Sequence, residues 1–222
     1  SYPAMTSVPF DKKSKLYFLK SMDDAIKTDE FLKTAKNIAV IGGGMTGVEV
    51  ARITQERGIQ TTLIHRNKNL LNDYLDEPAS HLLESWMNAE GMRLLLNTEV
   101  TEIGFDEENT IIQTANGQKI PVDGVIFTIG FRPNSYLLNQ QVELGDSGAV
   151  IVDEYMQTTC PDVFAVGDVS TTYVNLLGKS YYLPHASDAV RDGEIAAINL
   201  LAPRQKINSS QGTYHVPMNN LV

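Results

Sequence analysis

The sequence contains a single cysteine, Cys160, and no apolar run long enough to form a membrane-spanning helix. One cysteine excludes an intramolecular disulfide, and a free thiol is typical of proteins kept in a reducing cytoplasm. Because a bilayer-spanning helix takes about 20 consecutive apolar residues, we expect no membrane anchor. The opening stretch SYPAMTSVPFDKKSK also lacks the apolar core of a signal peptide. The sequence therefore predicts a cytoplasmic protein.

Basic residues are the second shortage. The chain has 18 Lys and Arg against 27 Asp and Glu, which gives a formal net charge of −9. Such a protein repels phosphate backbones and acidic lipid headgroups, so we expect neither a nucleic-acid partner nor a membrane partner. A small anionic ligand has to be held by local features, such as a helix N-terminus or a few basic side chains.

Groups that bind metals or act as nucleophiles are also scarce. The four histidines are scattered through the chain without metal-ligand spacing: His65, His81, His185 and His215. Cys160 precedes a proline, and no adjacent basic residue is present to activate its thiol. We therefore expect no metal site and no catalytic residue in this sequence.

A strand–helix–strand unit stands near the middle of the first half. Residues 37–41, NIAVI, are apolar without alternation, as is typical of a strand buried on both faces. The pattern predicts a helix over 46–57 that ends before Gly58, followed by a strand over 60–65. The turn between the first strand and the helix contains the spacing G-x-G-x-x-G.

Other elements follow from periodicity and turn residues. We expect a helix over 22–35 capped by Ser21 or Asp23, and a helix over 76–90 that ends at Gly91. The second of these places Leu82, Leu83 and Trp86 on one side. Further elements are predicted as strands over 92–97 and 124–130 and a helix over 185–201.

Residues 98–121 have a different texture. They alternate between apolar and polar and contain Asn116-Gly117, a strong hairpin signal, which predicts antiparallel strands over 98–105, 109–115 and 118–121. Such a meander takes the place of a crossover helix. The fold class is therefore predicted as α/β and Rossmann-like, with three layers: a β-sheet core, helices on one face and an antiparallel β-meander on the other.

The glycine turn predicts a dinucleotide site. It comprises Gly42, Gly43, Gly44, Met45, Thr46 and Gly47. Gly42 permits the tight turn, Gly44 lets a diphosphate approach the backbone, and Gly47 lets the helix pack close to the strand. Free N–H groups at the helix start would face the phosphates. The alternative is a tight turn with no ligand.

The end of the second strand bears on which dinucleotide is bound. An NAD site expects a carboxylate there to accept hydrogen bonds from ribose hydroxyls. The sequence instead has His65 and Arg66, followed by Lys68. These residues favour NADPH, whose 2′-phosphate an arginine attracts. NADH remains the alternative, with His65 donating to the ribose and Arg66 pointing to solvent.

A second motif lies at 158–170, TTCPDVFAVGDVS. We expect an apolar strand over Val163–Val166 that ends in Gly167-Asp168, where a freed carboxylate can accept hydrogen bonds from polyol hydroxyls. The alternative, which this motif alone favours, is an ordinary strand end with an aspartate cap. Together with NIAVIGGGMTGVEVA, GVIFTIGFRPNS and ASDAVRDGEIAAINL, this motif gives a specific pattern in a specific order. The chain resembles the pyridine nucleotide–disulfide oxidoreductase family, in particular its NADH oxidase, NADH peroxidase and coenzyme A–disulfide reductase branch.

The resemblance implies an FAD/NAD(P)-binding fold and a domain order. The expected parts are a linker over 1–15, an NAD(P)H-binding domain over 16–134, the second part of an FAD-binding domain over 135–205, and a tail over 206–222 leading toward a dimer-interface domain. The family's first FAD-binding half and its redox cysteine have no counterpart in this sequence, so the chain resembles a central fragment.

The resemblance also implies roles for single residues around FAD. Asp168, after Gly167, would bind the ribityl–pyrophosphate region of the flavin. The start of the last helix would lie near the flavin pyrimidine edge, through Pro184, His185 and Ala186.

Three more residues are assigned by the resemblance to the nicotinamide side. Gly130 would approach the bound dinucleotide, and Glu49 would look toward the contact between flavin and nicotinamide. Met45 stands where the family usually has a tyrosine lid, and it serves either as packing or as a gate.

The function that the resemblance implies is passage of a hydride from NADPH or NADH to FAD and on to a disulfide, a peroxide or oxygen. The complete enzyme would act on a small-molecule substrate and form a homodimer, whereas this chain alone would be inactive. The alternative is a non-catalytic nucleotide-binding or redox-sensing module. A dehydrogenase with its own substrate domain is less favoured, because no catalytic His/Lys or Tyr-x-x-x-Lys arrangement is present.

Overall fold

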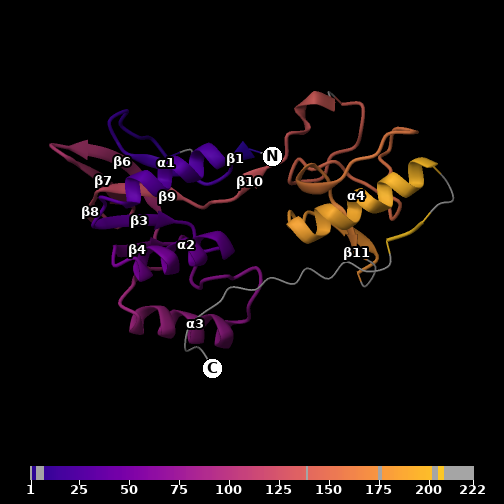
Figure 1. The fold of residues 1–222 in the computed structure, drawn as a ribbon. Coiled ribbons are helices and arrows are strands. Elements are labelled where there is room, and N and C mark those ends of the chain that lie inside the picture. The colour runs from indigo at the N-terminus through magenta and orange to yellow at the C-terminus, as the bar shows by residue number, and fades with distance from the viewer. Residues whose placement is uncertain (1, 4–7, 139, 175–176, 202–204, 208–222) are drawn as a thin grey trace. The chain divides into compact units, whose positions relative to one another are not determined.

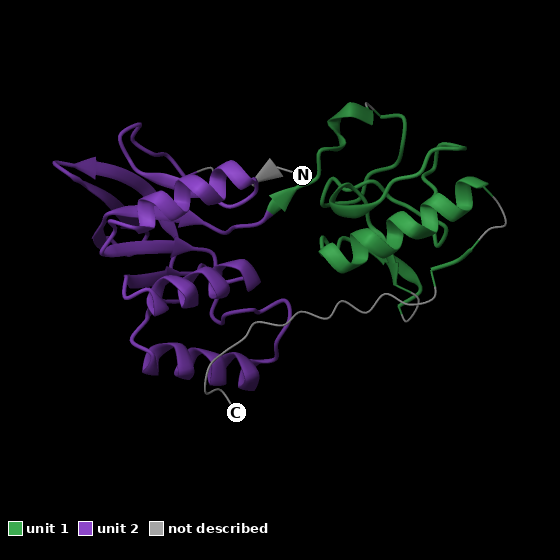
Figure 2. Cartoon of the chain, viewed as in Figure 1, with its two compact units in different colours: residues 1–2, 131–215 green, residues 3–130, 216–222 purple. Residues whose placement is uncertain are grey.

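The computed structural model describes residues 2–3, 8–138, 140–174, 177–201 and 205–207 (Figure 1). The chain divides into two compact units (Figure 2). Unit 2 runs from Pro3 to Gly130, and unit 1 contains the described residues from Phe131 onward together with Tyr2.

Unit 2 is built on a five-stranded parallel sheet with the strand order β2-β9-β3-β4-β5. The strands are β2 (Leu16–Phe18), β3 (Asn37–Ile41), β4 (Gln60–Ile64), β5 (Arg93–Leu95) and β9 (Gly124–Phe127). Each neighbouring pair is parallel. The carboxyl ends of β3, β4 and β9 therefore meet at one edge of the sheet, the edge where ligands bind in open α/β folds.

Three helices cover one face of this sheet: α1 (Met22–Leu32), α2 (Met45–Glu56) and α3 (Glu77–Ala89). Ile38 and Val40 of β3 are fully buried against them, beside Val48 of α2. Alternation along a strand sends neighbouring side chains to opposite faces, which explains why one strand serves two cores.

The opposite face is covered by an antiparallel meander of β6 (Val100–Asp106), β7 (Asn109–Thr114) and β8 (Lys119–Val122). Ala39 and Val125 of the sheet pack there against Ile103 and Ile112. The predicted three-layer α/β fold is thus confirmed. The described residues 8–15 also lie along the meander, since Phe10 forms a parallel bridge with Ile103.

Unit 1 has less regular structure. Its elements are β10 (Phe131–Arg132), the short helices η1 (Ser135–Leu138) and η2 (Gly167–Val169), the antiparallel pair β11 (Thr172–Val174) and β12 (Lys179–Tyr181), and the helix α4 (Ala186–Leu201). The two-residue strand β1 (Tyr2–Pro3) spans the sequence boundary between the units. A separate core holds it together, in which Val150 and Met156 are fully buried and Ile195 of α4 is nearly so.

Most predicted elements are confirmed, with ends that differ by three residues or fewer. Two expectations are wrong. No strand forms over Val163–Val166, where Phe164 makes only an isolated bridge with Gln157 and Gly167 turns the chain into η2. Leu82 does not face the core but is 55% exposed, because the buried face of α3 repeats through Leu83 and Met87.

Some segments escaped prediction. Strand β2 was not expected, and neither were β11 and β12. Of the predicted tail over 206–222, only Lys206 and Ile207 fall within the described residues.

Candidate functional site

The glycine turn lies at the carboxyl end of β3 and is closed on two sides by backbone. Gly42 has a φ of +118°, which favours glycine, and a Cβ added there would stand 2.6 Å from the Thr128 carbonyl oxygen. A Cβ on Gly47 would stand 1.8 Å from the Gly42 carbonyl oxygen. Both glycines are therefore required by the packing of the turn itself, as the spacing predicted.

Thr128 braces this turn and was missed by the sequence analysis. Its Oγ1 donates to the carbonyl oxygens of Ile41 and Gly42, each at 3.0 Å. Thr128 follows β9, which pairs with β3, so the ends of these two strands meet. A hydroxyl residue at the end of the predicted strand over 124–130 was the available signal.

Gly44 is the open side of the turn. A Cβ added at Gly44 would meet no atom within 4 Å among the described residues. Gly44 is also the N-cap of α2, and no side chain caps this helix, whereas Ser21 caps α1 and Asp76 caps α3. The first N–H groups of a helix have no partner within it, so this end of α2 can take an anionic ligand.

Gly43 is held by protein at both of its peptide groups. Its N–H donates to His65 Nδ1 at 3.0 Å, and its carbonyl oxygen accepts from the Leu71 N–H at 2.9 Å. A Cβ on Gly43 would stand 2.6 Å from the His65 ring and from Leu70. Within the turn, Gly43 therefore shapes the backbone, and the open surface for a ligand is at Gly44.

His65 follows β4 and is half-buried. An N–H can only donate, so His65 Nδ1 carries no proton and accepts the Gly43 hydrogen. The other nitrogen, Nε2, lies 3.1 Å from Asn72 Oδ1 and donates to it. Both ring nitrogens are thus engaged within the protein, which leaves none for the ribose hydroxyl that the NADH alternative required.

Arg66 lines an open pocket of about 410 Å³ and makes no ion pair with any described residue. The full lining is Arg66, Asn67, Asn97, Thr98, Glu99, Ala115 and Asn116. Backbone hydrogen bonds join the three segments that form it. The N–H of Asn97 donates to Asn67 O, that of Thr98 to His65 O, and that of Ala115 to Glu99 O.

Lys68, the third basic candidate near this edge, is occupied elsewhere. Its Nζ lies 2.5 Å from Glu77 Oε1, and this hydrogen bond raises the pKa of Lys68 and lowers that of Glu77. Arg66 is consequently the basic side chain of this loop that remains available to a phosphate.

The remaining predicted residues of unit 2 lie around α2 and the end of β9. Met45 opens α2 and packs against the helix-side core, Thr46 follows it, and Glu49 is half-buried one turn along. Gly130 is exposed with a φ of +93°, and a Cβ there would meet nothing within 4 Å. Open space at Gly130 is compatible with the expected approach of a dinucleotide.

In unit 1 the structure brings the two predicted flavin segments together. A Cβ on Gly167 would lie 3.5 Å from the Ala189 side chain, so the η2 turn contacts the first turn of α4. The Tyr182 hydroxyl donates to the Asp168 carbonyl oxygen at 3.2 Å, and burial, then the charge of Asp168, raises the pKa of Tyr182. The helix end is accessible, because Pro184 and Ala186 are exposed.

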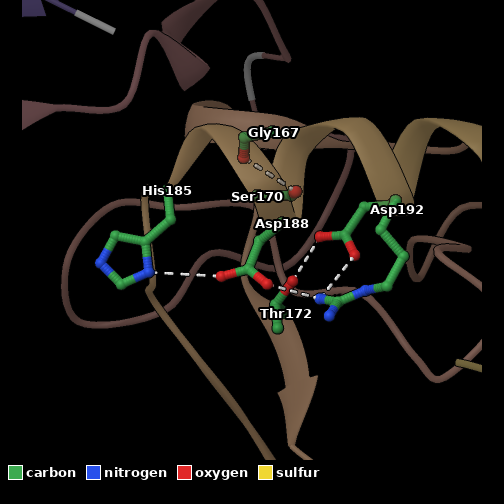
Figure 3. A network of polar contacts seen from close by, with 7 residues as sticks. Gly167, Ser170, Thr172, His185, Asp188 and Asp192 are labelled. Atoms are coloured by element: carbon green, nitrogen blue, oxygen red, sulfur yellow. Dashed lines mark hydrogen bonds and ion pairs between the residues drawn. The ribbon is translucent and has the colours of Figure 1, made fainter. Parts of the chain in front are cut away.

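Behind this helix end lies a polar network that the sequence analysis missed (Figure 3). Asp188 and Asp192 project from α4 and are each 2% exposed. Arg191 Nη2 donates to Asp188 Oδ1 at 2.7 Å and to Asp192 Oδ1 at 3.3 Å, and the Thr172 hydroxyl donates to Asp192. The signal available in the sequence was a pair of aspartates four residues apart on an otherwise apolar helix face.

The charges in this network are incompletely matched. His185 Nδ1 lies 3.3 Å from Asp188 Oδ2, within ion-pair range but without hydrogen-bond geometry. Burial raises the pKa of Asp192, and the Thr172 hydrogen bond and Arg191 oppose that change. The accessible start of α4 and the carboxyl-bearing η2 turn thus lie together, and Asp188 Oδ2 beneath them accepts no hydrogen bond from a described residue.

The described residues were predicted to hold neither a metal site nor a membrane-spanning helix. They contain no group of three or more His, Cys, Asp or Glu side chains able to hold a metal ion. None of their helices is both long and apolar enough to cross a bilayer. Cys160 is a free thiol that packs against the core of unit 1.

Comparison with known proteins adds a family. The family model for pyridine nucleotide-disulphide oxidoreductases matches residues 1–193. An NADH oxidase of Enterococcus faecalis is 34% identical over 214 residues, which cover 96% of this chain and 48% of that protein. A second NADH oxidase, from Lactococcus lactis, is 34% identical, with 90% of this chain and 46% of that protein covered.

Solved structures agree. The water-forming NADH oxidase of Lactobacillus brevis bound to NADH is 31% identical, with a TM-score of 0.88, covering 92% of this chain and 45% of that one. An engineered NADPH oxidase made from it and bound to NADPH gives the same values. The chain thus spans about half the length of the curated relatives it matches.

Proposed function

Because the chain belongs to the pyridine nucleotide-disulphide oxidoreductase family, we propose that unit 2 binds NADPH at the glycine turn and that unit 1 carries part of an FAD site. The complete protein then passes a hydride from NAD(P)H to FAD and on to a disulfide, a peroxide or oxygen. A small-molecule acceptor, a homodimer and a cytoplasmic location belong to the same proposal.

The observation that carries the proposal is the contrast between neighbouring glycines. At Gly42 and Gly47, backbone atoms occupy the space that a Cβ would need. The space beside Gly44 is open, and Gly44 begins a helix that no side chain caps. This is the arrangement that lets a diphosphate approach N–H groups without meeting a side chain.

Arg66 supports NADPH over NADH. A 2′-phosphate accepts charge-assisted hydrogen bonds from a guanidinium, and the position directly after β4 holds His65 rather than a carboxylate. The engineered relative bound to NADPH differs from its NADH-binding parent by five substitutions, which remove one aspartate and introduce two arginines. In this chain the residues after β4, His65 and Arg66, likewise include an arginine and no aspartate.

In unit 1 we propose that Asp168 and the start of α4 hold FAD, which accepts the hydride when bound. The first N–H groups of α4, from Ala186 onward, would face the flavin pyrimidine edge, and the η2 turn would place the Asp168 carboxylate near the ribityl hydroxyls. The protein's part in such chemistry is to bind and orient the two cofactors and to exclude water from between them. No described residue is assigned to the acceptor side.

The nucleotide assignment is tested by calorimetry with NADPH and NADH on the natural chain and on Arg66→Ala. Loss of a charged hydrogen bond should weaken NADPH binding by about 1.5–3 kcal/mol and leave NADH binding unchanged. Lys68→Ala is the matched control, since Lys68 pairs with Glu77. Equal losses for both nucleotides, or no loss, would remove the NADPH assignment.

The flavin assignment is tested by an absorbance spectrum after mixing with FAD. We expect this chain alone to bind NAD(P)H with a Kd on the order of micromolar or weaker, to hold FAD poorly and to show no turnover. Adding a separately expressed first half of a family member should increase FAD retention. Unchanged retention would favour the non-catalytic nucleotide-binding or redox-sensing alternative, whereas a yellow chain that oxidises NADPH rapidly would contradict the expected inactivity.

A further inference from the structure

We propose that His65 is a positioning residue for the diphosphate turn, acting as a neutral hydrogen-bond acceptor whose protonation weakens nucleotide binding. The proposal rests on the proposed function of that turn and adds to it a residue that need not touch the nucleotide. It makes binding at unit 2 depend on which of the two ring nitrogens carries a proton.

The argument begins with the direction of one hydrogen bond. The Gly43 N–H and His65 Nδ1 are 3.0 Å apart, and only the ring nitrogen can accept. The ring is also too close for any side chain at position 43, since an added Cβ would stand 2.6 Å from it. Glycine at 43 and histidine at 65 are therefore fitted to each other.

A relay of amides fixes the same tautomer from the other side. Asn72 Oδ1 lies 3.1 Å from His65 Nε2 and also accepts from Asn67 Nδ2 at 2.9 Å. The Asn72 amide nitrogen donates to Asp73 Oδ1 at 2.8 Å, which leaves Asn72 Oδ1 facing the ring as an acceptor. The relay holds the proton on Nε2 and the lone pair on Nδ1.

The turn depends on this arrangement because, among the described residues, only His65 accepts a hydrogen bond from the Gly43 N–H. Its carbonyl is tied to the Leu71 N–H at 2.9 Å, so the segment from His65 to Leu71 grips Gly43 at both peptide groups. The next residue, Gly44, begins the open surface. A turn held in shape before the ligand arrives loses less entropy on binding.

A protonated Nδ1 is a hydrogen-bond donor, as is the Gly43 N–H that faces it. Protonation of Nδ1 would therefore break the hydrogen bond between them. The charged side chains on the elements around the ring are Arg66 next to it, Asp73 at the end of the relay, and Glu99 on the loop after β5. A proton on His65 would also bring a positive charge toward a diphosphate. A purely electrostatic role therefore predicts tighter binding in acid, and a positioning role predicts weaker binding.

Calorimetry with ADP-ribose distinguishes tighter binding in acid from weaker binding in acid. ADP-ribose has the diphosphate but lacks a 2′-phosphate, whose own titration near pH 6 would confuse the result. We expect its Kd to rise on the order of fivefold between about pH 8 and pH 5.5, the value of one ordinary hydrogen bond. His65→Gln retains an acceptor that does not titrate, and its affinity should be nearly constant over the same range.

Two further variants define the control and the loss of the acceptor. His81→Gln replaces an exposed histidine of α3 and should keep the natural pH dependence. His65→Phe fills the space without an acceptor and should bind weakly at both pH values, provided that its circular dichroism matches that of the natural chain. The glutamine variant tests the proposal whether or not the phenylalanine variant folds.

Nitrogen NMR of the chain without ligand provides the direct observation. The proposal requires a protonated Nε2, an unprotonated Nδ1, and a scalar coupling across the hydrogen bond between Gly43 N and His65 Nδ1 that disappears in acid. A protonated Nδ1 at pH 8, tighter ADP-ribose binding in acid, or an equal pH dependence in His65→Gln would each overturn it. If ADP-ribose bound at neither pH, the proposed function would fail, while the NMR coupling would still test the link between His65 and Gly43.

Discussion

At the scale of single residues, the glycine turn assigns a different physical role to each position. Gly42 supplies a positive φ, Gly47 a close approach of helix to backbone, and Gly44 an unobstructed surface. Gly43 takes a fourth role, since its peptide groups connect the turn to the segment after β4. The folding requirements of this motif can therefore be separated by substitution from the ligand requirements that we propose for it.

Alanine at two of these positions should separate folding from binding. Gly44→Ala should fold with nearly natural stability, because the added methyl meets no protein atom, yet it should abolish measurable NADPH binding by occupying the path of the diphosphate. Gly47→Ala should unfold or fail to accumulate, since its methyl would overlap backbone. Thermal melts and calorimetry check both variants.

Gly104→Ala is the matched control for that pair. It lies in β6 of the same unit, and the nearest atom to its added Cβ is 4.0 Å away. Stability and NADPH affinity should both be close to natural. Natural NADPH affinity in Gly44→Ala would show that the nucleotide does not approach the turn from its open side.

Glu99 gives a second prediction at this scale. Glu99 lines the same pocket as Arg66, and its negative charge would repel a 2′-phosphate that entered there. Glu99→Gln should tighten NADPH binding by about 0.5–1 kcal/mol at low salt and leave NADH binding unchanged. Glu102→Gln, on the exposed side of β6, is the control. No change in NADPH affinity with Glu99→Gln would place the 2′-phosphate outside this pocket.

At the scale of elements, a buried carboxylate of α4 connects this helix to strand β11. Asp192 accepts from Thr172 of β11 and from Arg191 of its own helix, while only 2% of it is exposed. Because burial raises its pKa, the folded chain binds this proton more tightly than the unfolded chain does. The contribution of Asp192 to stability is therefore greatest in acid. It is lost as the pH rises through the raised pKa that Asp192 has in the folded state.

Asp192→Asn should remove that dependence on pH. Between the ordinary aspartate value of about 4 and neutral pH, unit 1 of the natural chain should lose thermal stability relative to the variant. The measurement is the midpoint of thermal unfolding followed across this pH range. Glu194→Gln, an exposed change on the same helix, should keep the natural slope. A natural slope in Asp192→Asn would assign the dependence to another group.

Elements were predictable where their hydrophobic pattern was long or their turns were distinctive. The buried run at 37–41 and the turn at Asn116-Gly117 led to strands that the structure confirms. The apolar run at Val163–Val166 misled, because its backbone forms hydrogen bonds with Met156 and Thr158 of a loop rather than with a strand. Burial within a loop-rich core gives the same apolar pattern as burial within a sheet.

The site was predictable in part for a related reason. Local spacing located the glycine turn and the residues that follow β4, His65 and Arg66. Thr128 contacts the glycine turn across 86 residues of sequence, so the spacing within the turn does not mark it. Contacts of this kind depend on the strand order of the sheet, which the sequence does not spell out.

At the scale of the whole molecule, each unit has its own hydrophobic core. The helix-side and meander-side cores of unit 2 draw only on residues within 8–130, and the core of unit 1 draws on residues from Leu138 onward. A chain of residues 8–134 should consequently fold cooperatively and bind NADPH about as tightly as the full sequence does. Calorimetric melting and NADPH titration of both chains test this, and an unfolded shorter chain would show that unit 2 needs further residues.

One consequence of the packing under the glycine turn concerns engineering. The α3 side chains Ser80 and Glu84 hold both peptide groups of Leu70, at 2.8 and 2.9 Å, and the next residue along grips Gly43. Helix α3 therefore supports the glycine turn through Leu70 and Leu71, although it belongs to a different stretch of the sequence. Libraries meant to retune cofactor preference should therefore sample positions 80 and 84 together with 65 and 66, since changes to the support alter the geometry of whatever is built on it.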